Sequence, residues 1–401
     1  MPFALALAFA CVPLFPAFIT LTTATIPGVS LIPAHVTAAL LAAMVALVAY
    51  WAVMLASAPR VGSPILLPLL AWFASGVLAV ALGFNPRDGL IFVGIFGMGV
   101  VWHCSVIRYY ACAGTARAIA WALLLSGATA ALAAVAMVVL RIPAHQYTIG
   151  HGRAIGTFVL PGELAGYLII FLPIAYAIAR TTRERALRAM AWIALGIGSL
   201  AFVLTFSRTG WVGLASAIAF FIVVRARRRG AAILVGLLVI ALALGAVLLV
   251  FNVDHNPSEN YTRLSIWQAA LHIINRFPLT GVGPFGFSRL YAVVRLPGGD
   301  ATAFHAHSVY LTFLAEIGIV GFSAFVWTWY SFAARLREAL RGATPQASFL
   351  ALALAAGLVG TLVQGLIDVV SVVIFGLWLP TLAYALAAAR HGLGESPAHD
   401  E

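Results

Sequence analysis

Apolar runs long enough to cross a lipid bilayer recur along almost the whole of this chain of 401 residues. A helix needs about 20 apolar residues to cross a bilayer core of about 30 Å, and it satisfies its backbone hydrogen bonds internally. The composition agrees, since 63% of the residues are hydrophobic and 9% are charged. We therefore expect an all-α polytopic integral membrane protein with about 12 transmembrane helices. The expected spans lie near residues 3–20, 31–56, 61–83, 89–107, 114–140, 158–179, 189–206, 209–224, 231–251, 307–332, 348–367 and 369–389.

The basic residues of this chain are all Arg, and their positions give the orientation, because basic residues gather in cytoplasmic loops. With the N-terminus inside, most of them lie in loops expected inside: Arg60, Arg108, Arg117, Arg180, Arg183, Arg185, Arg188, Arg225, Arg227, Arg228, Arg229, Arg335, Arg337, Arg341 and Arg390. The segments expected outside contain Arg87, Arg141, Arg153, Arg208, Arg263, Arg276, Arg289 and Arg295. This predicts that both chain ends are cytoplasmic. It also accounts for the formal net charge of +11, so we expect no nucleic-acid partner.

The cysteines and the N-terminus carry little further information. Cys11 lies in the first expected span, and Cys104 and Cys112 lie near the inner surface, so we expect no disulfide. No cluster of metal ligands accompanies them. The first apolar segment has no basic stretch before it and no clean small-x-small cleavage site, so we interpret it as an uncleaved span.

One connection on the outer side is long and has structure of its own, from about Asn252 to Phe304. Residues 263–277 have the apolar spacing of an amphipathic helix, with Pro278 at its end and an adaptable glycine turn after it. The apolar positions of this expected helix are Leu264, Trp267, Leu271 and Ile274. The chain thus divides into residues 1–251 with nine spans, 252–306 as the outer loop, 307–390 with three spans and 391–401 as a cytoplasmic tail.

Polar side chains expected outside the membrane gather in three short segments. Arg binds phosphate oxygens with a planar fork and stays charged, and a neutral His accepts a proton near pH 7. This combination indicates chemistry on a phosphorylated lipid at the outer surface. The candidate site residues are Arg153, Ser207, Arg208, Arg263, Trp267, His305, His307 and Glu316.

In these segments the chain resembles the bacterial O-antigen ligase family, within the wider superfamily of O-antigen ligases and polymerases. The resemblance extends from about Gly152 to Gly321, and the first 140 residues match it only in hydropathy. The chain departs from the family pattern at Ser308 and Gly162, where Asn is common. The shared motifs are Arg-x-x-Gly-Thr-Phe at 153–158, Ser-Arg at 207–208, an Arg and Trp helix at 263–267, Pro-x-x-Gly-x-Gly at 278–283, His-x-His at 305–307 and Glu-x-Gly at 316–318.

The resemblance implies a glycosyltransferase of lipopolysaccharide biosynthesis in the bacterial inner membrane, with its active site on the periplasmic side. Such an enzyme moves O-antigen from undecaprenyl diphosphate to a sugar hydroxyl of the lipid A–core, with inversion and without a metal or other cofactor. The carboxylate pairs that bind metals near phosphates are also missing from the expected outer segments. The expected partners are the lipid-linked donor, the lipid A–core acceptor and membrane lipids, and the oligomeric state stays open.

Each candidate residue has an expected role. The side chains of Arg153, Arg208 and Arg263 bind the diphosphate and stabilise it as it leaves. His307, which matches the family's second His, accepts the proton of the attacking hydroxyl, with His305 in reserve. Alternate residues point to opposite sides of a strand or helix, so we expect only one His to face the substrate. The supporting residues are Ser207, Trp267 and Glu316, the last pairing structurally or orienting the His or an Arg.

Several neighbouring residues have simpler interpretations. Arg276, Arg289 and Arg295 are expected to anchor lipid headgroups, and Asp368 is expected to form a turn or a helix cap. Two functions other than the ligase remain within the superfamily: a polymerase of O-antigen or exopolysaccharide, and an enzyme that transfers glycans to protein hydroxyls. A lipid flippase or solute transporter is the alternative of another class, but it predicts related halves and polar groups near the midplane, which this chain lacks.

Overall fold

The computed structural model is all-helical wherever it describes the chain. It describes residues 2–11, 62–112, 114–142, 147–148, 150–158, 160–226, 228–253, 257–295, 303, 305–368 and 372–393, and these contain no strand. The helices are α1 (Pro2–Cys11), α4 (Leu66–Leu82), α5 (Pro86–Tyr109), α6 (Thr115–Leu140), α8 (Pro161–Thr181), α9 (Arg185–Leu204), α10 (Arg208–Arg225), α11 (Arg229–Val253), α12 (Pro257–Arg276), α13 (Phe287–Val294), α14 (Val309–Arg341), α15 (Pro345–Gln364) and α16 (Val372–His391).

The expected fold class is confirmed, whereas the count of 12 spans is not. Among the described residues, 7 helices are long and apolar enough to cross a membrane, namely α5, α6, α8, α9, α10, α14 and α15. Helix α4 is apolar but shorter. The expected span at 31–56 lies outside the described residues, and of the span expected at 3–20 only the part in α1 is described.

Helix α15 packs against α10 and α8 through close contacts at glycine residues. A Cβ on Gly360 of α15 would lie 2.7 Å from the carbonyl oxygen of Gly213 in α10, and one on Gly213 would lie 2.8 Å from the carbonyl oxygen of Gly360. Lipid provides no hydrophobic drive that holds helices together, so close backbone approach at small residues supplies the contact. These glycines bring the N-terminus of α10 close to the C-terminus of α15.

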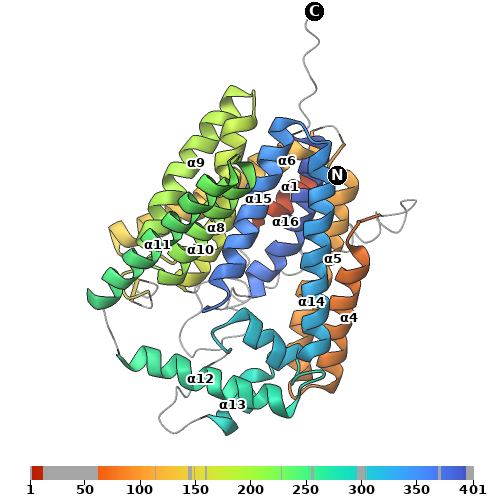
Figure 1. The fold of residues 1–401 in the computed structure, drawn as a ribbon, viewed down its shortest axis with the longest axis vertical. Coiled ribbons are helices and arrows are strands. Elements are labelled where there is room, and N and C mark those ends of the chain that lie inside the picture. Colours follow the sequence, from red (N-terminus) through yellow and green to blue (C-terminus); the bar gives the residue numbers. More distant parts are fainter. Residues whose placement is uncertain are drawn as a thin grey trace, which may run out of the picture.

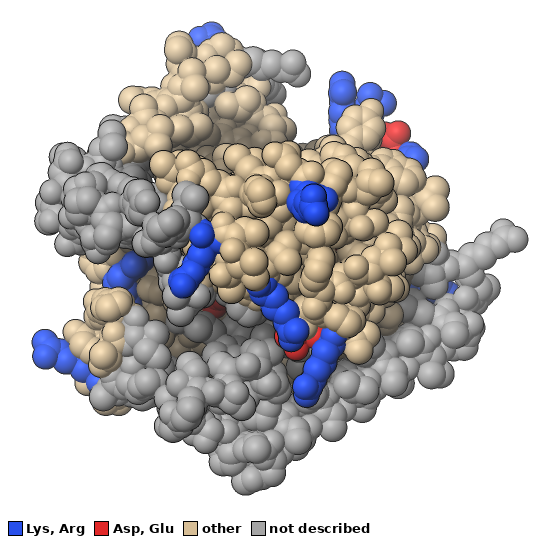
Figure 2. All heavy atoms as spheres, turned by 90° about the horizontal axis from the view of Figure 1, so that it is seen from below, with Lys and Arg blue, Asp and Glu red and all other residues tan. Residues whose placement is uncertain are grey.

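Figure 1 shows α12 and α13 across the lower end of the bundle, away from the connections between α8 and α9 and between α14 and α15. The two helices form a small core of their own with Ala306 and Ala315. The expected helix at 263–277 is therefore confirmed within α12. The two helices carry Arg263, Arg276 and Arg289, and Figure 2, viewed from below, shows several Arg side chains on the face seen there, with acidic side chains beside some of them.

The face of α12 that is buried differs from the expected one. Leu264 and Leu271 are 53% and 52% exposed, so the expected apolar face is wrong at these positions. The helix lies close to α14 through a narrower face, where small side chains permit the contact. From Arg263 onward, the buried residues of α12 are Ser265, Ile266, Ala269, Ala270 and Ile273.

Helix α14 is broken at Gly318, whose φ of 61° and ψ of −171° are not helical. The break separates a half-helix at residues 309–317 from the long remainder. The segment that follows Pro278 inserts there: the N–H of Val282 donates to Ala315 O at 2.9 Å, and the N–H of Ile319 donates to Pro278 O at 2.9 Å. The glycine turn expected to be adaptable is therefore a docked segment.

Candidate active site

Ser207 is the N-cap of α10 and places Arg208 at the first position of that helix. The Ser207 Oγ accepts a hydrogen bond from the N–H of Gly210 at 3.2 Å, and the Ser207 N–H donates to Thr205 Oγ1 at 3.2 Å. Ser207 is buried and Arg208 is partly buried. The N-terminus of a helix carries partial positive charge, so the backbone and Arg208 together favour an anion at this point.

Arg153 lies against the same turn. Its Nε donates to the carbonyl oxygen of Thr205 at 2.8 Å, and its Nη2 donates to that of Phe206 at 3.2 Å. The N–H of Ala154 donates to Leu204 O at 2.9 Å, which fixes the segment along the end of α9. The structure thus brings together two candidate arginines that are far apart in the sequence, and Arg153 holds the turn that precedes Arg208.

The C-terminal end of α15 connects this turn to two other elements. Asp368 accepts a hydrogen bond from Thr209 Oγ1 at 3.2 Å, and the Gln364 Nε2 donates to Gly162 O at 2.9 Å. Gly365 O accepts the N–H of Val309, the first residue of α14, at 2.8 Å. The N-termini of α8, α10 and α14 therefore meet at one place.

Asp368 lies in the turn that follows α15, in agreement with the sequence interpretation, but its contact with Thr209 of α10 was not expected. Gln364 was missed altogether. The available signal was their position: two polar residues, four positions apart, stand at the end of an otherwise apolar run.

The two histidines contact each other. Their ring centroids lie 4.7 Å apart at an interplanar angle of 73°, and the N–H of His307 donates to His305 Nδ1 at 3.3 Å. The expectation that the rings point to opposite sides is therefore wrong. That expectation holds for a strand or a helix, whereas His307 has a φ of 45°, in the left-handed region, which turns the chain back on itself.

The surroundings of His305 disfavour its protonated form. Burial, followed by the neighbouring His307, lowers the pKa of His305 to about 3. His305 is therefore neutral near pH 7, and because its Nδ1 accepts a hydrogen bond, the neutral ring carries its proton on Nε2. A base with so low a pKa accepts a proton poorly at neutral pH.

Arg263 and Trp267 lie one turn apart on α12, close to the His segment. Ala306, between the two histidines, packs in the same small core as Ile266 and Ala270 of α12. The Trp267 Nε1 is buried and has no hydrogen-bond partner among the described residues. Helix α12 thus meets the His segment through this core, whereas the turn with Arg208 meets it through α15.

Glu316 lies in the half-helix of α14 and faces the inserted segment. Its carboxyl group accepts hydrogen bonds from the backbone N–H groups of Phe285 and Phe287. These bonds connect it to the N-terminus of α13.

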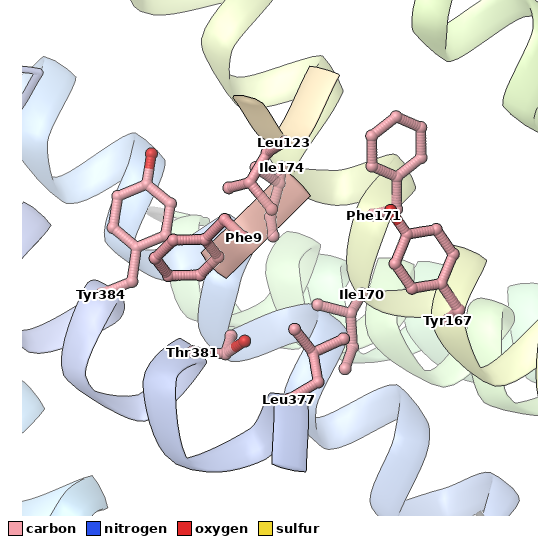
Figure 3. Close-up of a pocket in the computed structure, with 9 residues that line it drawn as sticks. All are labelled: Phe9, Leu123, Tyr167, Ile170, Phe171, Ile174, Leu377, Thr381 and Tyr384. Carbon is pink, nitrogen blue, oxygen red and sulfur yellow. The ribbon is translucent and has the colours of Figure 1, made fainter. Parts of the chain in front are cut away.

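A small cavity inside the bundle lies apart from these residues. Side chains of α1, α6, α8 and α16 surround it (Figure 3), and its volume of about 10 Å³ leaves room for about one water molecule. A sugar diphosphate is far too large for it. The lining residues are Phe9, Leu123, Tyr167, Ile170, Phe171, Ile174, Leu377, Thr381 and Tyr384. In the part of the chain that the structure describes, no group of three or more His, Cys, Asp or Glu could hold a metal ion, and the metal-free mechanism stays a prediction.

Comparison with known families gives a match over part of the chain. A family model described as O-antigen ligase matches residues 189–326, from α9 into the first half of α14. The match contains all the candidate residues except Arg153. A search of curated proteins gave no match. The resemblance seen in the motifs is confirmed over this segment, where residues 189–326 are similar to the O-antigen ligase family.

Proposed function

We propose that this protein is an O-antigen ligase, which transfers a glycan from undecaprenyl diphosphate to a sugar hydroxyl of the lipid A–core at the periplasmic face of the inner membrane. One observation carries the proposal. The end of α15 holds both the turn with Arg208, through Asp368 and Thr209, and the start of α14 directly after His307, through Gly365. The end of α15 thus contacts both Arg208's turn, the cationic site for the leaving group, and the helix that follows His307, the candidate base.

The diphosphate binds to Arg153, Arg208 and Arg263 in this proposal. The placement of Arg208 at the N-terminus of α10 supports it, since the helix dipole adds to the charge of the guanidinium group. Arg153 also holds the carbonyl groups of the turn, and it therefore contributes to the shape of the site. These positive charges stabilise the diphosphate as the bond to the sugar breaks.

His307 acts as the general base. It takes the proton from the acceptor hydroxyl while the hydroxyl oxygen forms a bond to the anomeric carbon and the bond from that carbon to the diphosphate breaks, with inversion. The low pKa of His305 favours His307 for this task. His305 instead orients His307 through its contact with the backbone and ring of that residue.

Deletion of the gene in its host tests the proposal. We expect the loss of glycan-bearing lipopolysaccharide together with an accumulation of polymer on the carrier lipid, and restoration by the wild-type gene. Loss of the polymer itself, without accumulation, would show a polymerase instead. Transfer by the purified protein in the presence of EDTA tests the chemistry, and inhibition that only added metal reverses would contradict the metal-free mechanism.

A further inference from the structure

The break in α14 has polar backbone groups that another segment must satisfy. The half-helix ends at Ile317. Because the helix is interrupted there, the carbonyl groups just before the break and the N–H groups just after it lack their usual partners within the helix. The segment 278–283 supplies partners on both sides: Val282 and Gly283 donate to Ala315 O and Glu316 O, each at 2.9 Å, and Pro278 O accepts from Ile319. The break and the inserted segment thus form one unit.

Glycine is required where the two parts touch. A Cβ on Gly281 would lie 2.6 Å from Ala315 O, and a Cβ on Gly318 would lie 2.6 Å from the backbone nitrogen of Thr280. Both glycines also have positive φ, 68° and 61°. A side chain at either position therefore separates the segment from the break, because the atoms it meets belong to the backbone.

Glu316 holds the far end of the inserted segment. Its carboxyl group accepts the N–H groups of Phe285 and Phe287, at the turn into α13. The ring of Phe287 is buried in the core that contains Ala306 and the buried face of α12. A displacement of Phe287 therefore affects both α12, which carries Arg263, and the segment with the histidines.

The opposite end of the half-helix is held by α15. The N–H of Val309 donates to Gly365 O at 2.8 Å, and the hydroxyl of Tyr310 donates to Leu362 O at 2.9 Å. The start of the half-helix that follows His307 is thus bonded to the end of α15, which also contacts the turn with Arg208. Its end is bonded to the inserted segment, which leads to the core shared with α12 and hence to Arg263.

We propose that Glu316 is a positioning residue of the transfer reaction: by holding residues 278–287 in the break of α14, it sets the position of His307 and Arg263 relative to each other. This inference rests on the proposed function. Glu316 itself touches neither the donor nor the acceptor in this role, and it accepts hydrogen bonds without exchanging a proton during the reaction.

Two variants and a matched control test the proposal in the full-length protein in detergent or lipid. Glu316→Ala removes both acceptors, whereas Glu316→Gln keeps one carbonyl oxygen. Glu338→Ala is the control, since Glu338 lies on the same helix but is exposed and pairs only with its neighbour Arg335 among the contacts described. The measurements are the transfer rate as a function of donor concentration, and amide hydrogen exchange over residues 278–290.

In Glu316→Ala we expect kcat to fall by about tenfold or more while the KM for the donor changes by less than about twofold, because misplacement affects the reacting geometry more than donor binding. Glu316→Gln should recover part of the rate, and Glu338→Ala should match the wild type. Exchange at Phe285 and Phe287 should become at least about tenfold faster in Glu316→Ala, while exchange in α8 and α15 stays unchanged.

Other outcomes overturn the proposal. Unchanged exchange over residues 278–290 in Glu316→Ala would show that the carboxyl group does not hold the segment. An inactive Glu316→Gln with a normal exchange pattern would show that Glu316 takes part in proton transfer. Exchange does not depend on the reaction, so it tests this contact even if the wild-type protein fails to transfer glycan, which would refute only the proposed function.

Discussion

Arg208 is the residue at which loss of charge should affect transfer most. In Arg208→Ala the turn still has its Ser207 cap, but the diphosphate loses a charged hydrogen bond. We expect a loss of roughly 3 kcal/mol or more of transition-state stabilisation, about 100-fold or more in rate. Arg208→Lys should recover little, because Lys lacks the planar fork. Arg263→Ala should behave similarly.

The measurement is the rate of transfer by purified protein from a lipid-linked donor. Arg289→Ala is the control, since Arg289 is an exposed outer Arg on α13 that we assign to headgroup contacts. Rates near wild type in both Arg208→Ala and Arg263→Ala would leave the diphosphate site without support, and an equal loss in Arg289→Ala would indicate a general effect of charge at the surface.

The variants His307→Ala and His305→Ala should differ in how much transfer activity they lose. We expect His307→Ala to lose transfer while it still binds the carrier lipid, because its task is to take a proton rather than to hold the diphosphate. His305→Ala should be milder, since the pKa of His305 is too low for an efficient base. Transfer and donor binding are measured for both variants. A His307→Ala protein that transfers normally, or that fails only because it no longer binds donor, would contradict the assignment.

The low pKa of His305 also predicts how stability depends on pH. The folded pKa is about 3, below the ordinary value of 6.5, so between these values the unfolded chain binds a proton that the folded chain excludes. The free energy of unfolding therefore falls as the pH falls below about 6.5. We expect the melting temperature to drop from pH 7 to pH 5, and to drop less in His305→Asn. The same dependence in both proteins would show that His305 is not buried in its neutral form.

At the scale of helices, the contact between α10 and α15 should tolerate no added atoms. A Cβ on Gly360 would meet Gly213 O at 2.7 Å and the side chain of Ile169 at 2.6 Å. We expect Gly360→Ala to destabilise the protein by about 1–3 kcal/mol, as overpacking does in other cores. It should also reduce transfer, because the same contact aligns Arg208 with the end of α15.

Gly196→Ala is the matched control for this substitution. Gly196 lies within α9, and a Cβ there would meet nothing within 4 Å. Alanine is the better helix former by about 1 kcal/mol, so this variant should be as stable as the wild type or more so. Thermal unfolding in detergent measures both variants, and equal stability of Gly360→Ala and Gly196→Ala would contradict the close packing.

The elements were largely predictable from the sequence, whereas their contacts were not. Apolar length fixes where a helix runs, and it correctly placed α5, α6, α8, α9, α10, α14 and α15. It does not reveal which side of α12 is buried, because two Ala residues there contribute little to an apolar pattern while Leu264 and Leu271 face outward. The break at Gly318 was equally hidden, since its partners lie 35 to 40 residues earlier in the chain.

The candidate site was predictable in its residue types but not in its assembly. Motifs singled out the arginines and histidines, and a family match contains most of them. The contact between the two histidine rings depends on the left-handed φ of His307, which no periodic pattern expresses. The link from Thr209 to Asp368 joins residues 159 positions apart, so only the folded bundle reveals it.

At the scale of the whole molecule, the distribution of Arg predicts which end of the bundle faces the cytoplasm. We expect single Cys substitutions at Arg183, Arg228 and Arg337 to resist a membrane-impermeant thiol reagent added from outside, and His272→Cys on α12 to react. All four positions are exposed, whereas Ser265, on the same helix as His272, is buried and would report poorly. The reverse pattern would invert the orientation and move the candidate site to the cytoplasmic side.

The labelling needs a background without reactive thiols. Cys112 is exposed and would react by itself from the inner side, so all three native cysteines are replaced by Ser or Ala. Each substituted protein is first checked for normal levels in the membrane. A parallel reaction after permeabilisation shows that the protected positions are accessible from the other side.

The insertion of residues 278–283 into the break of α14 also imposes an order on biogenesis. The inserted residues precede α14 in the chain, and an unfilled break would present bare N–H and C=O groups to lipid. The half-helix after His307 therefore reaches its final form only when residues 278–283 have docked against it. Until then Phe287 does not join α12, which carries Arg263, to the segment with the histidines, so the proposed site is complete only once this docking has taken place.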